Sequence, residues 1–134
     1  MRSTLILVLA SVTVVWLALP ATSAQQLYSG HNDFQVYCAS CHGTAAKGDG
    51  VIARSLAKRP PDLTKLSVRN NGVFPDERVG KTIDGRGPGS GHSTPDMPAW
   101  ADVFAKSQES AGAEAATARI ATLVEYLKTI QETR

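Results

Sequence analysis

Both cysteines of this chain lie in one short segment, Cys38-Ala-Ser-Cys-His42. Side chains three residues apart in a helix are neighbours on one face, so a helical segment would present both thiols side by side. His42 follows the second cysteine directly. A fold for this chain must therefore present two thiols and an imidazole within one helical turn.

The residues on either side of this segment predict helices. Gly30, Phe34 and Cys38 are spaced four apart, which predicts a helix that runs into the cluster and ends near Gly43. Residues 113–131 carry an apolar stripe made of Ile120, Leu123, Val124, Leu127 and Ile130. This stripe has to be buried, and we expect it to pack on the face that holds Gly30, where a missing side chain permits close approach.

The middle of the chain is predicted to be mostly loop. Residues 43–74 are interrupted by glycines and a Pro-Pro pair, which leaves room for one short helix near residues 51–57. Pro75 and the acidic residues after it predict a helix that ends at Gly85. Residues 85–100 are rich in Gly and Pro and lack the Gly-Lys-Ser/Thr ending of a phosphate-binding loop.

No segment has the pattern of a strand, so the sequence predicts an all-α fold with long loops. Long loops bury little apolar surface, and a small domain has little to spare. We therefore expect something other than side chains to fill part of the interior.

The N-terminal residues have the order of a secretory signal. Arg2 is followed by the apolar run Leu5–Leu19 and by small residues up to Ala24. The run is shorter than the ~20 residues of a membrane span. The sequence predicts a signal peptide over residues 1–24 and one domain over residues 25–134, exported to the periplasm. An uncleaved anchor that tethers the domain to the inner membrane is the alternative.

The charge of the chain argues against nucleic-acid binding. Its formal net charge is +2 at pH 7, and no strong basic excess covers one element. Between Lys47 and Lys81 there are eight basic and four acidic residues. This local excess is read as a solvated face or, alternatively, as a docking surface for an acidic partner.

Three kinds of site use a Cys-x-x-Cys-His cluster. A dithiol redox site needs a strand leading into a helix, which is missing here. A structural zinc site needs a fourth ligand, for which His31 and His92 are the candidates. Covalent haem attachment uses every residue of the cluster, because two neighbouring thiols bond the porphyrin and the histidine binds its iron. We expect one haem c, joined to Cys38 and Cys41 by thioethers and bound through iron by His42.

The second axial ligand of such an iron is sought among the remaining residues. Met97 is the only methionine after Met1, and it is held between Pro95 and Pro98, which restrict the backbone. His92, in the same loop, is the rival candidate. His31 lies on the helix of the cysteines and is expected at the surface.

With these residues the chain resembles the monohaem c-type cytochromes, the class I, Met/His-ligated family of exported electron carriers. The motifs that carry the resemblance span nearly all of residues 25–134: GHNDFQVYCASCHG, KGDG, PPDL, MPAW and ARIATLVEYL. The glycine-rich approach to Met97 departs from the family pattern and leaves the path of that loop open.

The resemblance implies a small cytochrome c fold, with three to five helices and long loops wrapped around one haem. It implies that Gly30 and Phe34 cross Leu123 and Tyr126. It also implies that the carbonyl of Pro61 accepts a hydrogen bond from the other ring nitrogen of the iron-bound histidine.

The implied function is electron transfer by a monomeric carrier, not an enzyme, that cycles between ferric and ferrous iron. Its partners would be redox proteins, with a membrane or periplasmic dehydrogenase or reductase as donor and an oxidase or reductase as acceptor. The alternative is a dedicated haem c subunit of a larger periplasmic dehydrogenase or oxidase complex. A peroxidase or gas sensor would require the Met97 side of the iron to open.

Overall fold

The computed structural model describes residues 29–86, 97–107 and 112–133. Within these ranges the fold is all-α, with five helices and no strand, as the sequence predicts. The predicted signal peptide and His92 lie outside them. Among the helices described, none combines the length and the apolar character needed to cross a membrane.

The first helical segment is continuous from Gly30 to His42. It consists of α1 (Gly30–Asp33), the π-helical turn η2 (Phe34–Cys38) and α2 (Ala39–His42). The Ser29 hydroxyl caps its start by accepting a hydrogen bond from a backbone N–H. Gly43, with φ of 80°, ends it where the spacing predicts. The π turn ends at the first cysteine, and such turns are frequent at functional sites.

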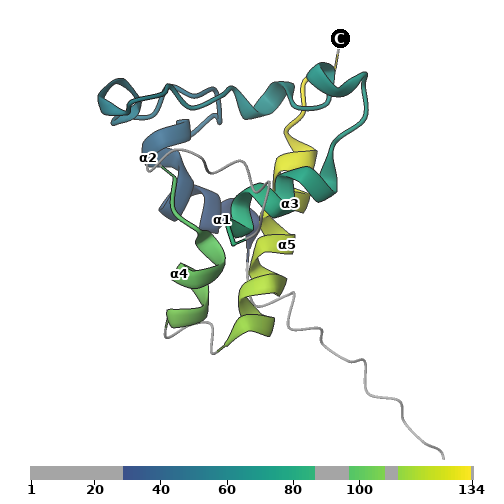
Figure 1. Ribbon diagram of the computed structural model, residues 1–134. Helices are drawn as coiled ribbons and strands as arrows, with labels where there is room; N and C mark the ends of the chain where they lie inside the picture. The colour runs from purple at the N-terminus through teal and green to yellow at the C-terminus, as the bar shows by residue number, and fades with distance from the viewer. Residues whose placement is uncertain (1–28, 87–96, 108–111, 134) are drawn as a thin grey trace, which may run out of the picture.

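Helix α5 (Ala113–Thr129) is the central element and contacts α1, α3 (Asp76–Asp84) and α4 (Trp100–Lys106), as Figure 1 shows. Its crossing with α1 is close, because a Cβ on Gly30 would overlap the carbonyl oxygen of Thr122. The rings of Phe34 and Tyr126 lie 5.4 Å apart at the same crossing. The predicted contact between these two helices is confirmed.

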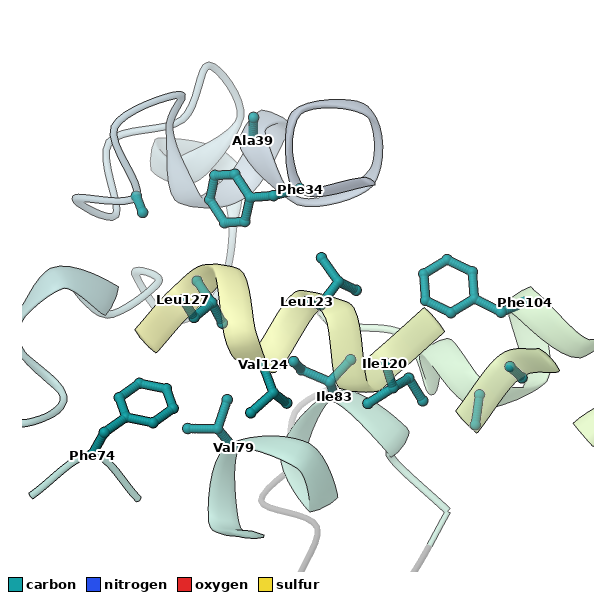
Figure 2. Packing of buried hydrophobic residues seen from close by; sticks show 13 residues of the cluster. Phe34, Ala39, Phe74, Val79, Ile83, Phe104, Ile120, Leu123, Val124 and Leu127 are labelled. Atoms are coloured by element: carbon teal, nitrogen blue, oxygen red, sulfur yellow. The ribbon is translucent and has the colours of Figure 1, made fainter. Parts of the chain in front are cut away.

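The apolar stripe of α5 is buried on two sides (Figure 2). Leu127 faces Phe34 of the first helical segment, whereas Val124 faces Val79 of α3. Phe104 of α4 packs near the other end of α5 and is fully buried. One apolar cluster therefore joins all the larger elements.

Helix α4 is a part of the fold that the periodicity of the sequence does not predict. It has 7 residues, too few for a repeated apolar pattern. Two of them, Ala101 and Phe104, are completely buried. A helix this short is marginal in isolation, so its contact with α5 stabilises it.

The long segment between α2 and α3 contains three short 3₁₀ turns, η3 (Ala53–Ser55), η4 (Leu63–Lys65) and η5 (Val68–Asn70). It runs along one end of the molecule in Figure 1. The turn η3 falls within the short helix expected near residues 51–57. The predicted loop character of this segment is confirmed.

The end of the chain fastens this loop to α5. Gln131 Oε1 accepts a hydrogen bond from Ser67 N at 2.9 Å, and its Nε2 donates to the carbonyls of Leu63 at 2.8 Å and Leu127 at 2.7 Å. Glu132 N donates to the carbonyl of Thr64 at 2.8 Å. These bonds fix the loop over the end of the central helix.

Candidate functional site

A cavity of about 390 Å³ lies between the first helical segment, the long loop, α3 and the segment that precedes α4. Its size falls within the ~300–1,000 Å³ of typical small-ligand sites. The five residues expected to hold or support a haem all line it: Cys38, Cys41, His42, Pro61 and Met97. Most other lining side chains are apolar, including Leu63, Leu66, Val79, Ile83 and Leu127.

The two cysteines are present as free thiols. Burial, and then the negative charges of Asp33 and Cys41, raise the pKa of the Cys38 thiol to about 12. Redox-active dithiols depend on a lowered thiol pKa, which favours the reactive thiolate. The environment of Cys38 has the opposite effect and disfavours the dithiol interpretation.

The loop after the cluster packs directly on the cysteine backbone. A Cβ on Gly50 would overlap the Ser40 carbonyl oxygen and the backbone of Cys41. Gly50 N donates to the carbonyl of Cys41 at 3.2 Å, and Ile52 N donates to that of Ser40 at 3.1 Å. The glycine is therefore required where the loop closes over the end of the helix.

His42 is 9% exposed, and its Nδ1 is a buried nitrogen without a hydrogen-bond partner. Burial lowers the pKa of its imidazole, and the backbone carbonyl of Pro61 acts in the opposite direction. Pro61 lines the same cavity as His42, but Nδ1 of the ring has no hydrogen-bond partner. A buried ring that is neutral and incompletely satisfied is suited to bind a metal through its other nitrogen.

Met97 is half-buried and packs against the core cluster at the wall of the cavity. The adjacent Pro98 lines the same cavity, and α4 begins at Trp100. The thioether is thus carried by a short segment anchored to a helix. The rival His92 lies outside the described residues, and His31 is exposed, with its ring against Tyr126 at 5.3 Å.

The cavity carries positive charge at part of its wall. Lys58, Arg59 and Arg78 line it, and none of the described lining residues is acidic. Arg59 is held by a hydrogen bond from its Nε to the Gly48 carbonyl at 3.2 Å. An apolar ligand with anionic substituents would match this distribution.

The zinc interpretation gains no support from the part of the chain that the structure describes. Within residues 29–86, 97–107 and 112–133, no three His, Cys, Asp or Glu side chains converge as a metal site. The two thiols and the imidazole of the cluster belong to these residues. They face one cavity without meeting at one point.

A buried ion pair next to the site was not predicted from the sequence. Arg119 of α5 donates from Nε to Asp33 Oδ2 at 2.7 Å and from Nη2 to Oδ1 at 2.6 Å. The two residues are only 2% and 6% exposed. The hydrogen bonds to Asp33 raise the pKa of the guanidinium further above its usual range, so Arg119 is charged.

A signal for this pair was present in the sequence. Arg119 precedes Leu123 and Leu127 by four and eight residues, which places it on their face of the helix. Asp33 directly precedes Phe34. Opposite charges on two helices that are expected to cross could have been paired.

Comparison with protein-family models, with curated proteins and with solved structures gives no match for this chain. The class of site is therefore inferred from its own residues. Two thiols, a buried imidazole and a thioether line one largely apolar cavity with a cationic side, and sulfur and imidazole groups of this kind can hold a metal cofactor.

Proposed function

We propose that this cavity binds one covalently attached haem and that the protein is an electron-transfer protein. More particularly, we infer a monohaem c-type cytochrome that carries single electrons between redox proteins outside the cytoplasm. The observation that carries this proposal is the gathering of Cys38, Cys41, His42 and Met97 around one cavity of about 390 Å³. The buried imidazole of His42 at the wall of this cavity supports the fit.

In this proposal each donor has a specific role. Cys38 and Cys41 hold the porphyrin through thioether bonds, and His42 and Met97 bind the iron. Lys58, Arg59 and Arg78 suit the two carboxylates of the ring. When bound, the haem supplies a one-electron couple between ferric and ferrous iron.

The side chains around the cavity would favour the reduced state. A neutral imidazole and an uncharged thioether favour ferrous iron relative to a pair of imidazoles. The apolar walls built by Leu63, Leu66 and Leu127 exclude water and disfavour added charge. If His42 and Met97 both bound the iron, no coordination position would be left for a substrate, and this would favour a carrier over an enzyme.

An exposed apolar surface lies beside the cluster and suits brief contact with a redox partner. Val51 is 91% exposed and Ile52 is 43% exposed. Ile52 is tied to the backbone of the cysteine helix by its bond to Ser40. Transient electron-transfer encounters bury small areas of this kind.

The test is to produce the protein in a host that attaches haem to exported chains. We expect a coloured protein whose spectrum changes on reduction and whose mass includes one haem. Cys41→Ser should lose one thioether and release haem more readily, whereas the control Ser40→Ala at the exposed neighbouring position should retain the wild-type mass and spectrum. A colourless wild-type protein would refute the proposal.

A second experiment separates the free carrier from a dedicated subunit. The native protein, purified without a tag, should elute as a free species of about 12 kDa after removal of the signal peptide. Co-elution with a larger dehydrogenase or oxidase would instead identify a permanent subunit of that complex.

A further inference from the structure

Three aromatic rings connect the cavity to the buried ion pair. The rings of Tyr37, Trp100 and Phe104, called the aromatic trio below, lie 5.4 to 5.7 Å apart. Tyr37 and Trp100 also line the cavity, whereas Phe104 is completely buried behind them. The trio joins the first helical segment to α4, because Tyr37 belongs to η2 and the other two rings belong to α4.

The guanidinium of Arg119 packs on this trio. Its central carbon lies 4.6 Å from the centre of the Phe104 ring and 4.9 Å from that of Tyr37. At these distances a cation is attracted to the face of an aromatic ring. Arg119 therefore contacts two helices at once, with Asp33 on one side and the rings on the other.

The chemistry of this contact requires arginine. A planar guanidinium can donate two parallel hydrogen bonds to one carboxylate and stack on rings at the same time. A lysine at this position would keep the charge but would lose the second bond and the flat stacking surface. Asp33 compensates the positive charge of Arg119, which allows the guanidinium to lie in a buried position.

A short connection links the aromatic trio to Met97. Only Pro98 and Ala99 separate Met97 from the first residue of α4. Ala99 is the N-terminal cap of α4, and its carbonyl accepts a hydrogen bond from Asp102 N at 3.2 Å. Pro98 has a fixed φ. The position of α4 therefore determines where the Met97 thioether can reach.

We propose that Asp33 and Arg119 form a positioning pair for Met97: by holding the aromatic trio they fix α4, and α4 presents the thioether to the cavity. The inference rests on the proposed role of Met97 as an iron ligand. Neither Asp33 nor Arg119 lines the cavity, and the pair acts on α4 through Phe104, on which the guanidinium packs.

A purely structural role makes a different prediction from a positioning role. A pair that only stabilises the fold would lower the temperature of unfolding and the temperature at which Met97 leaves the iron by the same amount. A positioning pair, once weakened, would let Met97 leave while the helices remain folded.

The experiment compares wild-type holoprotein with Arg119→Lys, Asp33→Asn and the control Val124→Ala. Val124 is a buried residue of the same helix that faces α3, and its truncation lowers stability without changing the pair. Two temperatures are recorded for each ferric protein: the loss of the weak long-wavelength absorption band of Met-ligated haem, and the loss of helical circular dichroism.

We expect the two temperatures to separate in Arg119→Lys and Asp33→Asn and to fall together in Val124→Ala. Hydrogen peroxide should oxidise Met97 several-fold faster in Arg119→Lys than in Val124→Ala. The reaction is run below both temperatures, and mass spectrometry measures its rate. If the difference between the two temperatures and the oxidation rate of Met97 in Arg119→Lys both equal those of the wild type, the inference is wrong, while the proposed function is unaffected. A wild-type protein that binds haem but lacks the band would instead overturn the assignment of Met97.

Discussion

At the scale of single residues, burial sets the chemical form of Cys38 and His42. The Cys38 thiol is held neutral by its surroundings, and burial lowers the pKa of the His42 imidazole. A neutral imidazole is the form that binds iron. Met97 adds a second uncharged donor. The states of Cys38 and His42 agree with the c-type haem site proposed above.

Replacement of Met97 by Ala tests the second axial position. We expect the long-wavelength band of the ferric protein to disappear and the reduced protein to bind carbon monoxide, because one coordination position becomes open. The reduction potential should fall, since the ligand that favours ferrous iron is lost. Absorption spectroscopy and redox titration measure these changes, and His31→Ala, at an exposed position, serves as the control. An unchanged spectrum would assign the position to another side chain, with His92 the next to be replaced.

At the scale of secondary structure, patterns in the sequence predicted three of the helical segments and missed a fourth. Pro75 and the acidic residues after it marked α3, and the five-residue apolar stripe marked α5. In α4 the apolar residues occupy two turns directly after a Pro-rich loop, so no period could be recognised. Its helical state depends on the burial of Phe104 against α5, which is tertiary information.

The candidate ligands that line the cavity were predicted from the sequence, whereas the ion pair beside it was not. Cys38, Cys41 and His42 form a local motif, and Met97 followed from counting the remaining donors. The spacing of these residues carries no information about charge compensation across helices. The Asp33–Arg119 pair was therefore missed, although each partner lies next to a predicted core residue.

Two glycine substitutions test the crossing of α1 with α5. Gly30→Ala should destabilise the protein by about 1–3 kcal/mol, because the added methyl group would overlap the backbone of Thr122. Gly80→Ala in α3 is the matched control, since its Cβ would meet only Val124 at an ordinary contact distance of 3.8 Å. That change should stabilise the helix by about 0.5–1 kcal/mol. Denaturant titration of both variants measures the two effects, and equal free energies of unfolding would contradict the close crossing.

At the scale of the whole molecule, the interior contains a large cavity beside a small core. The cavity of about 390 Å³ lies among the side chains that would otherwise pack on one another. Without a ligand, these side chains lack contacts on one side and the fold loses their dispersion energy. The fold is therefore expected to depend on what fills the cavity.

Folding should accordingly depend on haem attachment. We expect the double variant Cys38→Ser/Cys41→Ser, exported in the same host, to show a lower helical content and rapid proteolysis. Circular dichroism and limited trypsin digestion compare it with the holoprotein and with Ser40→Ala. A compact, protease-resistant double variant without haem would show that the protein core is sufficient by itself.

The charge of the molecule gives a further prediction about partners. The structure pairs several of the basic residues between Lys47 and Lys81, such as Lys81 with Glu77 at 2.6 Å. Arg54 is exposed close to Val51 and Ile52 and outside the cavity, where charge can guide an acidic redox partner. Arg54→Ala should slow electron transfer with an acidic partner at low salt and reduce its dependence on ionic strength, whereas Lys81→Ala should have little effect. Stopped-flow rates across a salt series measure this, and equal losses in the two variants would exclude a specific docking role.

The bonds of Gln131 and Glu132 have a practical consequence for handling the protein. These two residues anchor the loop that carries Pro61 and Leu63. Cleavage of the chain before Gln131 would release that loop from α5 and open one side of the cavity to solvent. A preparation cleaved there should lose the proposed haem faster than an intact one, so the presence of both residues should be checked by mass before any reduction potential is measured.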